Sequence, residues 1–163
     1  MYAQEMKLPE GKQCAAFISV NLAAEFFWLS LDKRAAEMPK TLSLGQYGMT
    51  HGLPRLLSLL DELHIKATFF VPGKTAETYP EKIREIADRG HEIACHGYEY
   101  ENFGLLDAEE QRERIGKAVK AIEDACGKKP AGFRAPIGDL MLETLDIARE
   151  YGMTYSSDLY DDD

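Results

Sequence analysis

The segment "KATFFVPGKTAETYPEKIREIADRGHEIAC", residues 66–95, decides the fold because it contains two buried strands with a helix between them. Its ends, "KATFFV" (66–71) and "HEIAC" (91–95), are short apolar runs of the kind that form buried strands. Between them, "PEKIREIADRG" (80–90) has helical spacing, begins on a proline and ends on a glycine. This order predicts two parallel strands joined by a right-handed crossover.

The same alternation continues on both sides of this unit. Further strands are predicted at 14–21, 131–136 and 153–157, and further helices at 53–64, 107–127 and 142–152. The segment 107–127 has the clearest boundaries, because Asp107 followed by Glu110 is a capping signature and Gly127 is a typical stop. Five strands with four intervening helices predict an α/β fold, either an open sheet or a barrel.

One segment does not fit the alternation. Residues 30–50 are rich in Met, Leu and Gly, and are predicted to form a long loop that is either functional or an oligomer contact. The predicted strands are apolar enough for burial on both faces, which a parallel sheet requires.

Composition limits the possible partners. The chain has 163 residues, 45% of them hydrophobic, which is enough for one core, so residues 1–163 are interpreted as a single domain. A net charge of -9 would repel nucleic acid. No signal-peptide pattern and no apolar run long enough to span a bilayer is found, so we expect a soluble, cytoplasmic protein without a membrane partner. Three widely spaced cysteines indicate neither a disulfide framework nor a thiolate zinc site.

Polar residues follow four of the predicted strands at the carboxyl end of each. They are Asn21, His96, Arg134 and Asp158. In parallel α/β folds, ligands bind at this end of the sheet, so we expect the four side chains to converge. Each could alternatively satisfy local backbone groups or pair with a surface charge.

Seven blocks of the sequence, taken in order, resemble the polysaccharide deacetylase family of carbohydrate esterases, and most closely its peptidoglycan deacetylase and allantoinase-like branch. The blocks are "SVNLAAEFFW", "LSLGQYG", "GLPRLLSLLDEL", "IKATFFVPG", "RGHEIACHGYEYEN", "GFRAPIG" and "YGMTYSSDL". The resemblance implies a distorted, incomplete β/α barrel. About five parallel strands would have helices outside, and this chain would not close the barrel. We therefore expect a domain truncated at its carboxyl end.

The resemblance also implies a reaction. Members of the family remove the acetyl group from an N-acetylated sugar, or open a related amide, and thus cleave non-peptide C–N bonds. A divalent metal, usually zinc, is held by one Asp and two His. It polarises the amide and activates water, while an Asp acts as base and a His from a late strand as acid.

Carried over residue by residue, the match is incomplete. Asn21 and Ala23 stand where the family has two acids, and Tyr100 stands where it has the second histidine of a His-x-x-x-His pair. His96 is the remaining metal ligand, so zinc binding is expected to be weak. Arg134, with Pro136 and Gly138, matches the segment whose arginine orients a catalytic acid. No histidine follows His96 to serve as the acid.

The candidate site therefore has three parts. Asn21 and Arg134 are the candidate catalytic residues, and His96 is the candidate metal ligand, with Ala23 and Tyr100 in the other two metal positions. Substrate contacts are predicted for Trp28, Tyr98, Glu101, Pro136 and Asp158. Trp28 follows Phe26 and Phe27, and this aromatic group could stack on a sugar or belong to a core or subunit contact.

Three hypotheses remain open at this point. The chain is an impaired hydrolase by descent, a non-catalytic carbohydrate-binding or scaffold protein, or a fragment completed by missing strands or a partner. A carbohydrate or small amide is the expected substrate in the first case. We also expect a homo-oligomer, because an unclosed barrel leaves apolar surface that needs cover.

Overall fold

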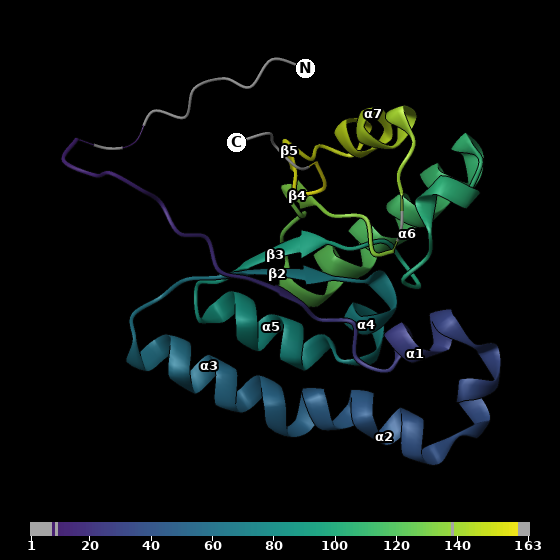
Figure 1. Ribbon diagram of the computed structural model, residues 1–163, viewed down its shortest axis with the longest axis horizontal. Helices are drawn as coiled ribbons and strands as arrows, with labels where there is room; N and C mark the ends of the chain where they lie inside the picture. The colour runs from purple at the N-terminus through teal and green to yellow at the C-terminus, as the bar shows by residue number, and fades with distance from the viewer. Residues whose placement is uncertain (1–7, 9, 138, 160–163) are drawn as a thin grey trace.

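The computed structural model describes residues 8, 10–137 and 139–159. Five parallel strands form one sheet in chain order (Figure 1). The strands are β1 (Ser19–Asn21), β2 (Thr68–Val71), β3 (Glu92–Cys95), β4 (Gly132–Phe133) and β5 (Tyr155–Ser156). Because β1 and β5 do not pair with each other, the sheet stays unclosed, and the predicted five-stranded α/β architecture is confirmed. Gly138 of the predicted arginine segment lies outside the described residues.

The four predicted helices are present. They are α3 (Leu53–Glu62), α5 (Pro80–Asp88), α6 (Ala108–Cys126) and α7 (Leu142–Glu150). At the start of α6, the Asp107 carboxylate accepts the backbone N–H groups of Glu109 and Glu110, and the Glu110 side chain accepts the N–H of Asp107. Gly127 ends the helix in the left-handed conformation, at φ 77°. The capping prediction is therefore confirmed at both ends.

The prediction of a long loop at 30–50 was wrong, because most of the segment is helical. It contains the end of α1 (Phe26–Leu31), a 3-10 helix η1 (Lys33–Glu37) and α2 (Pro39–Tyr47). Sequence periodicity missed α2 because its buried residue is a glycine, Gly45, and the helix has no apolar stripe. Two other short elements were not predicted, α4 (Gly73–Thr78) and the 3-10 helix η3 (Phe103–Leu105).

Helices α2 and α3 form one helical run, joined by a π-helical turn η2 (Gly48–Gly52). In this turn the N–H of Leu53 donates to the carbonyl of Gly48, five residues earlier. The next residue, Pro54, has no N–H and would crowd the carbonyl four residues before it in a regular α-helix. The wider turn removes that crowding, so the helical run passes through the proline.

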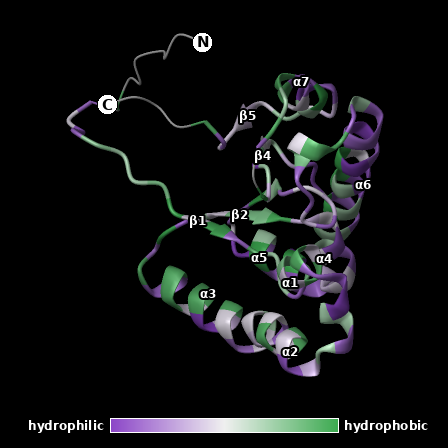
Figure 2. Ribbon diagram, turned by 45° about the vertical axis from the view of Figure 1, so that its right-hand side comes forward, coloured by the Kyte–Doolittle hydropathy of each residue, from purple (hydrophilic) through white to green (hydrophobic). Residues whose placement is uncertain are grey.

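The two faces of the sheet differ in how other parts of the chain pack on them. On one face, strand side chains such as Phe69, Val71 and Ile93 enter the core, together with Ile83 of α5 and Ile115 of α6. Hydrophobic and hydrophilic residues are interspersed along the helices (Figure 2), and buried apolar residues of α3, α5 and α6 belong to this core. No helix in the described part of the chain is long and apolar enough to cross a membrane.

The other face of the sheet is hollowed. A depression of about 650 Å³ is lined there by alternate strand residues and by the extended segment before β1. Its lining includes Thr68, Phe70, Glu92, Arg134 and Tyr155. This hollow runs to the carboxyl ends of the strands, where the candidate site lies.

Candidate functional site

Arg134 follows β4 and joins the ends of three strands. Its Nη1 donates to Asn21 Oδ1 at 2.9 Å and to Ser19 Oγ at 3.2 Å. Its Nη2 donates to Ser157 Oγ at 2.6 Å, and its Nε donates to the Ser157 carbonyl at 3.3 Å. We call Ser19, Asn21, Arg134 and Ser157 the arginine cluster. The predicted convergence of Asn21 and Arg134 is thus found in the structure.

The guanidinium of Arg134 also lies over an aromatic ring. Its central carbon is 3.9 Å from the centroid of Phe70, a buried residue of β2. This stacking fixes the plane of the guanidinium and shields one side of it from water. Asp158 lies beside the cluster, where its carboxylate accepts the N–H of Ala135 at 2.6 Å and the hydroxyl of Ser156.

A second group of side chains surrounds His96, which follows β3. The His96 ring makes an edge contact with Tyr100, with ring centroids 5.0 Å apart. Tyr100 makes an edge contact with Phe27 at 5.6 Å, and Phe27 makes one with Trp28 at 5.0 Å. We call these four residues the aromatic cluster. Such pairs add stabilisation beyond the area that they bury.

The histidine of this cluster is held neutral. His96 Nδ1 lies 2.7 Å from the backbone carbonyl of Arg134, so Nδ1 carries the proton and Nε2 presents a lone pair. Burial is the main cause that lowers the pKa of His96 to about 4. Nε2 is buried and has no hydrogen-bond partner among the described residues. A neutral imidazole with a free Nε2 is the form that binds metals.

The residues at the other two predicted ligand positions nevertheless do not suit a metal ion. Ala23, with 8% of its surface exposed, offers a methyl group, and Tyr100, with 7% exposed, offers a phenol. Burial raises the pKa of Tyr100 above its usual range, which keeps the phenol protonated. Within residues 8, 10–137 and 139–159, no three His, Cys, Asp or Glu residues are placed to hold a metal ion. The residues present therefore do not fit the metal that the family resemblance implies.

The backbone around this position is unusual. Tyr100 has φ 68°, a left-handed conformation that non-glycine residues rarely adopt. Ala24, one residue beyond Ala23, also has a positive φ of 51°. The Ala23 carbonyl accepts the hydroxyl of Thr75 at 3.2 Å, which ties this loop to α4. Strained backbone of this kind clusters at functional sites in proteins.

Three residues predicted to contact substrate have structural contacts instead of a place in either cluster. The Tyr98 hydroxyl donates to Glu77 of α4 at 3.0 Å, and its ring lies beside Lys74. The Glu101 carboxylate accepts the N–H of Tyr98 at 3.0 Å and so closes its own loop. Pro136 packs on Gly97, where an added Cβ would lie 2.9 Å from Pro136 Cγ.

Sequence reasoning missed two residues of the arginine cluster. Ser19 and Ser157 lie at or beyond strand ends, but serine is too common there to be a signal by itself. Ser19 precedes Asn21 by two positions in a strand, so both side chains lie on one face of the sheet, and this alternation could have identified Ser19.

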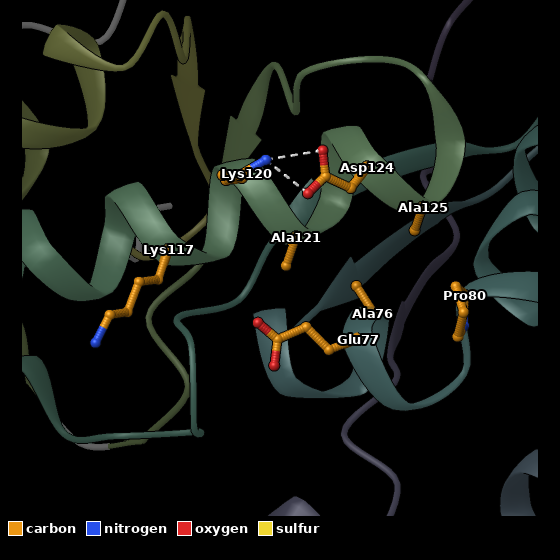
Figure 3. A pocket seen from close by; sticks show the side chains of 8 residues that line it. All are labelled: Ala76, Glu77, Pro80, Lys117, Lys120, Ala121, Asp124 and Ala125. Carbon is orange, nitrogen blue, oxygen red and sulfur yellow. Dashed lines mark hydrogen bonds and ion pairs between the residues drawn. The ribbon is translucent and has the colours of Figure 1, made fainter.

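A separate hollow on the outer helices, between α4 and α6, is lined by no strand-end residue (Figure 3).

Comparison with known proteins shows which family this geometry belongs to. The family model described as polysaccharide deacetylase matches residues 44–156. This match covers more than half of the chain and contains β2 to β5. The chain belongs to the polysaccharide deacetylase family. The resemblance inferred from the seven sequence blocks is therefore confirmed.

Individual relatives agree with the family model. The chain is 32% identical over 153 residues to the peptidoglycan deacetylase of Helicobacter pylori, a match covering 94% of this chain and 52% of that protein. It is 33% identical over 155 residues to the peptidoglycan deacetylase-like protein FGM2 of Gibberella zeae, covering 93% and 46%. The chain thus spans about half the length of these relatives.

A solved structure supports the fold. The crystal structure of a polysaccharide deacetylase homologue from Mycobacterium smegmatis superimposes with a TM-score of 0.90 at 39% sequence identity. The match covers 94% of this chain and 54% of that one. The sheet of parallel strands with helices around it therefore matches the fold of this family. Family members generally use a divalent metal, whereas no group of three His, Cys, Asp or Glu residues placed to hold one occurs in the part of the chain that the structure describes.

Proposed function

We propose that this chain is an amide hydrolase by descent, of the type that cleaves non-peptide C–N bonds in N-acetylated sugars or related amides, and that its metal-dependent hydrolysis is impaired. The observation that carries this proposal is the aromatic cluster. Tyr100 and Phe27 pack where a metal centre would need ligands, and only His96 offers a suitable atom. The metal that such a centre would take is zinc or another divalent ion.

The chemistry of the arginine cluster supports the same proposal. Hydrolysis of an amide requires a base that accepts a proton from water. Asn21 has an amide side chain, which does not titrate, and its oxygen already accepts the guanidinium of Arg134. The cluster can orient a polar substrate group, but it contains no carboxylate that could act as the base.

The relatives support an N-acetylated carbohydrate as the substrate class, because the Helicobacter pylori relative is a peptidoglycan deacetylase. The alternative of a non-catalytic carbohydrate-binding or scaffold protein is not favoured by these matches, although it shares the same cleft. We extend the proposal to self-association, because Phe17 beside the hollow is 81% exposed. Sedimentation at micromolar concentration checks this part, and a compact monomer would count against it.

The main experiment restores the two altered ligand positions. A double variant, Ala23→Asp with Tyr100→His, is titrated with zinc by calorimetry beside the unchanged protein. Because Asp, His and the existing His96 form a three-residue ligand set, we expect the variant to bind one equivalent at least about a hundredfold more tightly. A matched control, Ala23→Asn with Tyr100→Phe, changes the same positions without adding a charged or imidazole ligand.

The outcomes separate clearly. Tight binding by the double variant alone supports the proposal that a metal centre has been replaced. Tight binding of one equivalent by the unchanged protein, or chelator-sensitive release of acetate from an N-acetylglucosamine oligomer, would overturn it. Equal, weak binding by the double variant and its control would show that Ala23 and Tyr100 do not occupy ligand positions.

A further inference from the structure

We propose that the arginine cluster binds a carboxylate-bearing ligand, so that the substrate class of the site is an acidic sugar or acidic amide. That this ligand is a substrate rests on the proposed function, whereas the binding site itself follows from the contacts of the arginine cluster. The proposal concerns Ser19, Asn21, Arg134 and Ser157, which line or border the hollow on the open face of the sheet.

The first argument is charge. All four acceptors that Arg134 contacts are neutral oxygens, namely one amide, two hydroxyls and one backbone carbonyl. No ion pair to Arg134 occurs in the part of the chain that the structure describes. A guanidinium keeps its charge at every physiological pH, so the hollow contains a cation without a counter-ion from these residues.

Two acids beside the hollow or the cluster have other partners. The Asp158 carboxylate accepts hydrogen bonds from Ala135 N–H and the Ser156 hydroxyl. Glu92, at the other end of β3, accepts the hydroxyls of Thr68 at 2.7 Å and Tyr155 at 2.8 Å. Each carboxylate is therefore held in place by its own donors, and neither forms an ion pair with Arg134.

The second argument is the excess of donors. When the hydroxyl oxygens of Ser19 and Ser157 accept from Arg134, each hydroxyl proton remains to be donated. Neither proton has an acceptor among residues 8, 10–137 and 139–159. Asn21 turns its oxygen toward the guanidinium, so its NH₂ group is directed away from Arg134 as a further donor. A set of donors around a cation fits an anion with several acceptor oxygens.

The third argument is shape. The hollow measures about 650 Å³, within the usual range for small-molecule sites. Phe70 lies under the guanidinium at 3.9 Å and holds it flat. Four of the five guanidinium N–H groups already donate to Ser19, Asn21 and Ser157, so one N–H of Nη2 remains to donate to a carboxylate oxygen beside the serine hydroxyls. The remaining lining combines apolar and aromatic side chains, such as Phe17 and Tyr155, with the charged side chains of Lys66 and Glu92.

The identity of residue 21 provides the decisive variant. In Asn21→Asp, a carboxylate of almost the same size would stand 2.9 Å from Arg134 and supply the counter-ion from within the chain. The ligand would then have to compete with an internal partner of the same chemistry. The same substitution at Asn102, whose side chain caps η3 and does not line the hollow, adds an equal charge elsewhere.

The experiment is a titration of the full chain with glucuronate and with glucose at low ionic strength, followed by amide chemical shifts. We expect glucuronate to bind in the millimolar range and glucose at least about tenfold more weakly, because a charge-assisted hydrogen bond contributes about that factor. Asn21→Asp and Arg134→Gln should each weaken glucuronate binding by at least about tenfold, and Asn102→Asp should stay within about twofold. Thermal unfolding of each variant confirms that it folds.

Three results would overturn the proposal. They are no glucuronate binding by the unchanged protein, equal binding of glucose and glucuronate, and unchanged glucuronate affinity in folded Asn21→Asp. None of these titrations contains zinc, and the zinc titration contains no sugar. Failure of one proposal is therefore distinguishable from failure of the other.

Discussion

The arginine cluster and the aromatic cluster lie at the same edge of one sheet, yet they have opposite character. In the arginine cluster, a charged side chain makes four hydrogen bonds to neutral oxygens beside an open hollow. In the aromatic cluster, His96 is fully buried, and its contacts with Tyr100 are edge-to-face ring contacts. A single hydrogen bond, from His96 to the carbonyl of Arg134, joins the two.

The difference shows that the two neighbouring groups are held together by different interactions. Around His96, the rings of Tyr100 and Phe27 pack against one another, and aromatic side chains gain stability by burial. At residue 21, the amide oxygen of Asn21 gives Arg134 a neutral acceptor at 2.9 Å. We therefore expect the aromatic cluster to contribute to stability and the arginine cluster to contribute to binding.

The largest effect should follow removal of the ring at position 100. Tyr100→Ala should lower the free energy of unfolding by about 4 kcal/mol, because a buried aromatic side chain would leave a cavity beside His96 and Phe27. Urea unfolding followed by fluorescence of the single tryptophan, Trp28, measures it. Tyr100→Phe keeps the ring and should cost less than about 1 kcal/mol. A cost below about 1 kcal/mol for the alanine variant would refute the stabilising role.

The next largest effect should be a loss of folding stability at acidic pH. The folded-state pKa of His96, about 4, lies below its ordinary value of 6.5. Stability should therefore be complete above pH 6.5 and should fall as the pH drops toward 4, because the unfolded chain gains a proton first. The loss should reach about 3 kcal/mol. Unfolding measured between pH 7 and 4 should show a steeper fall in the unchanged protein than in His96→Gln, and parallel curves would contradict this.

A smaller effect should come from the loop that leads to Tyr100. Gly97 has φ 68°, and an added Cβ would lie 2.9 Å from Pro136 Cγ. Gly97→Ala should therefore cost about 2 kcal/mol. Gly127 has a similar φ of 77° but nothing within 4 Å, so Gly127→Ala isolates the conformational part, at about 1 kcal/mol. Equal melting temperatures for the two variants would show that the contact with Pro136 is unimportant.

The smallest effect should be in the arginine cluster. Ser157→Ala removes the hydroxyl that accepts from Arg134 at 2.6 Å, but water in the open hollow can replace it. We expect a loss of no more than about 1 kcal/mol in unfolding free energy. The comparison of the two clusters would fail if this loss matched that of Tyr100→Ala.

Much of the fold could be predicted from sequence, because strong local signals coincide with buried elements. The helix from Asp107 to Gly127 shows this best, since its cap, apolar stripe and terminal glycine all lie in the chain itself. Helix α2 could not be found in this way. It packs through Gly45, whose missing side chain lets the backbone of Glu25 approach. Hydrophobic periodicity detects apolar side chains, so it cannot detect a contact that a glycine makes.

Some residues of the candidate site could likewise be predicted from the sequence, and others could not. Strand ends brought Asn21, His96 and Arg134 to one region, as expected for a parallel sheet. The role of Tyr98 was not predictable, because the loop turns through left-handed residues at Gly97 and Tyr100 and sends the Tyr98 ring to α4. Side-chain direction in such a loop depends on backbone angles that the sequence does not state.

The π-helical turn between α2 and α3 amounts to one extra residue in an otherwise regular helix. Because an α-helix rotates by about 100° per residue, that residue sets the rotational phase of α2 relative to α3. Deleting one residue from 48–52 would turn Gly45 away from Glu25 and bring a bulkier neighbour against the loop after β1. A change far from both clusters would in this way displace Ala23 and Asn21 together. The position of these strand-end residues therefore depends on the rotation that the π-helical turn gives to α2.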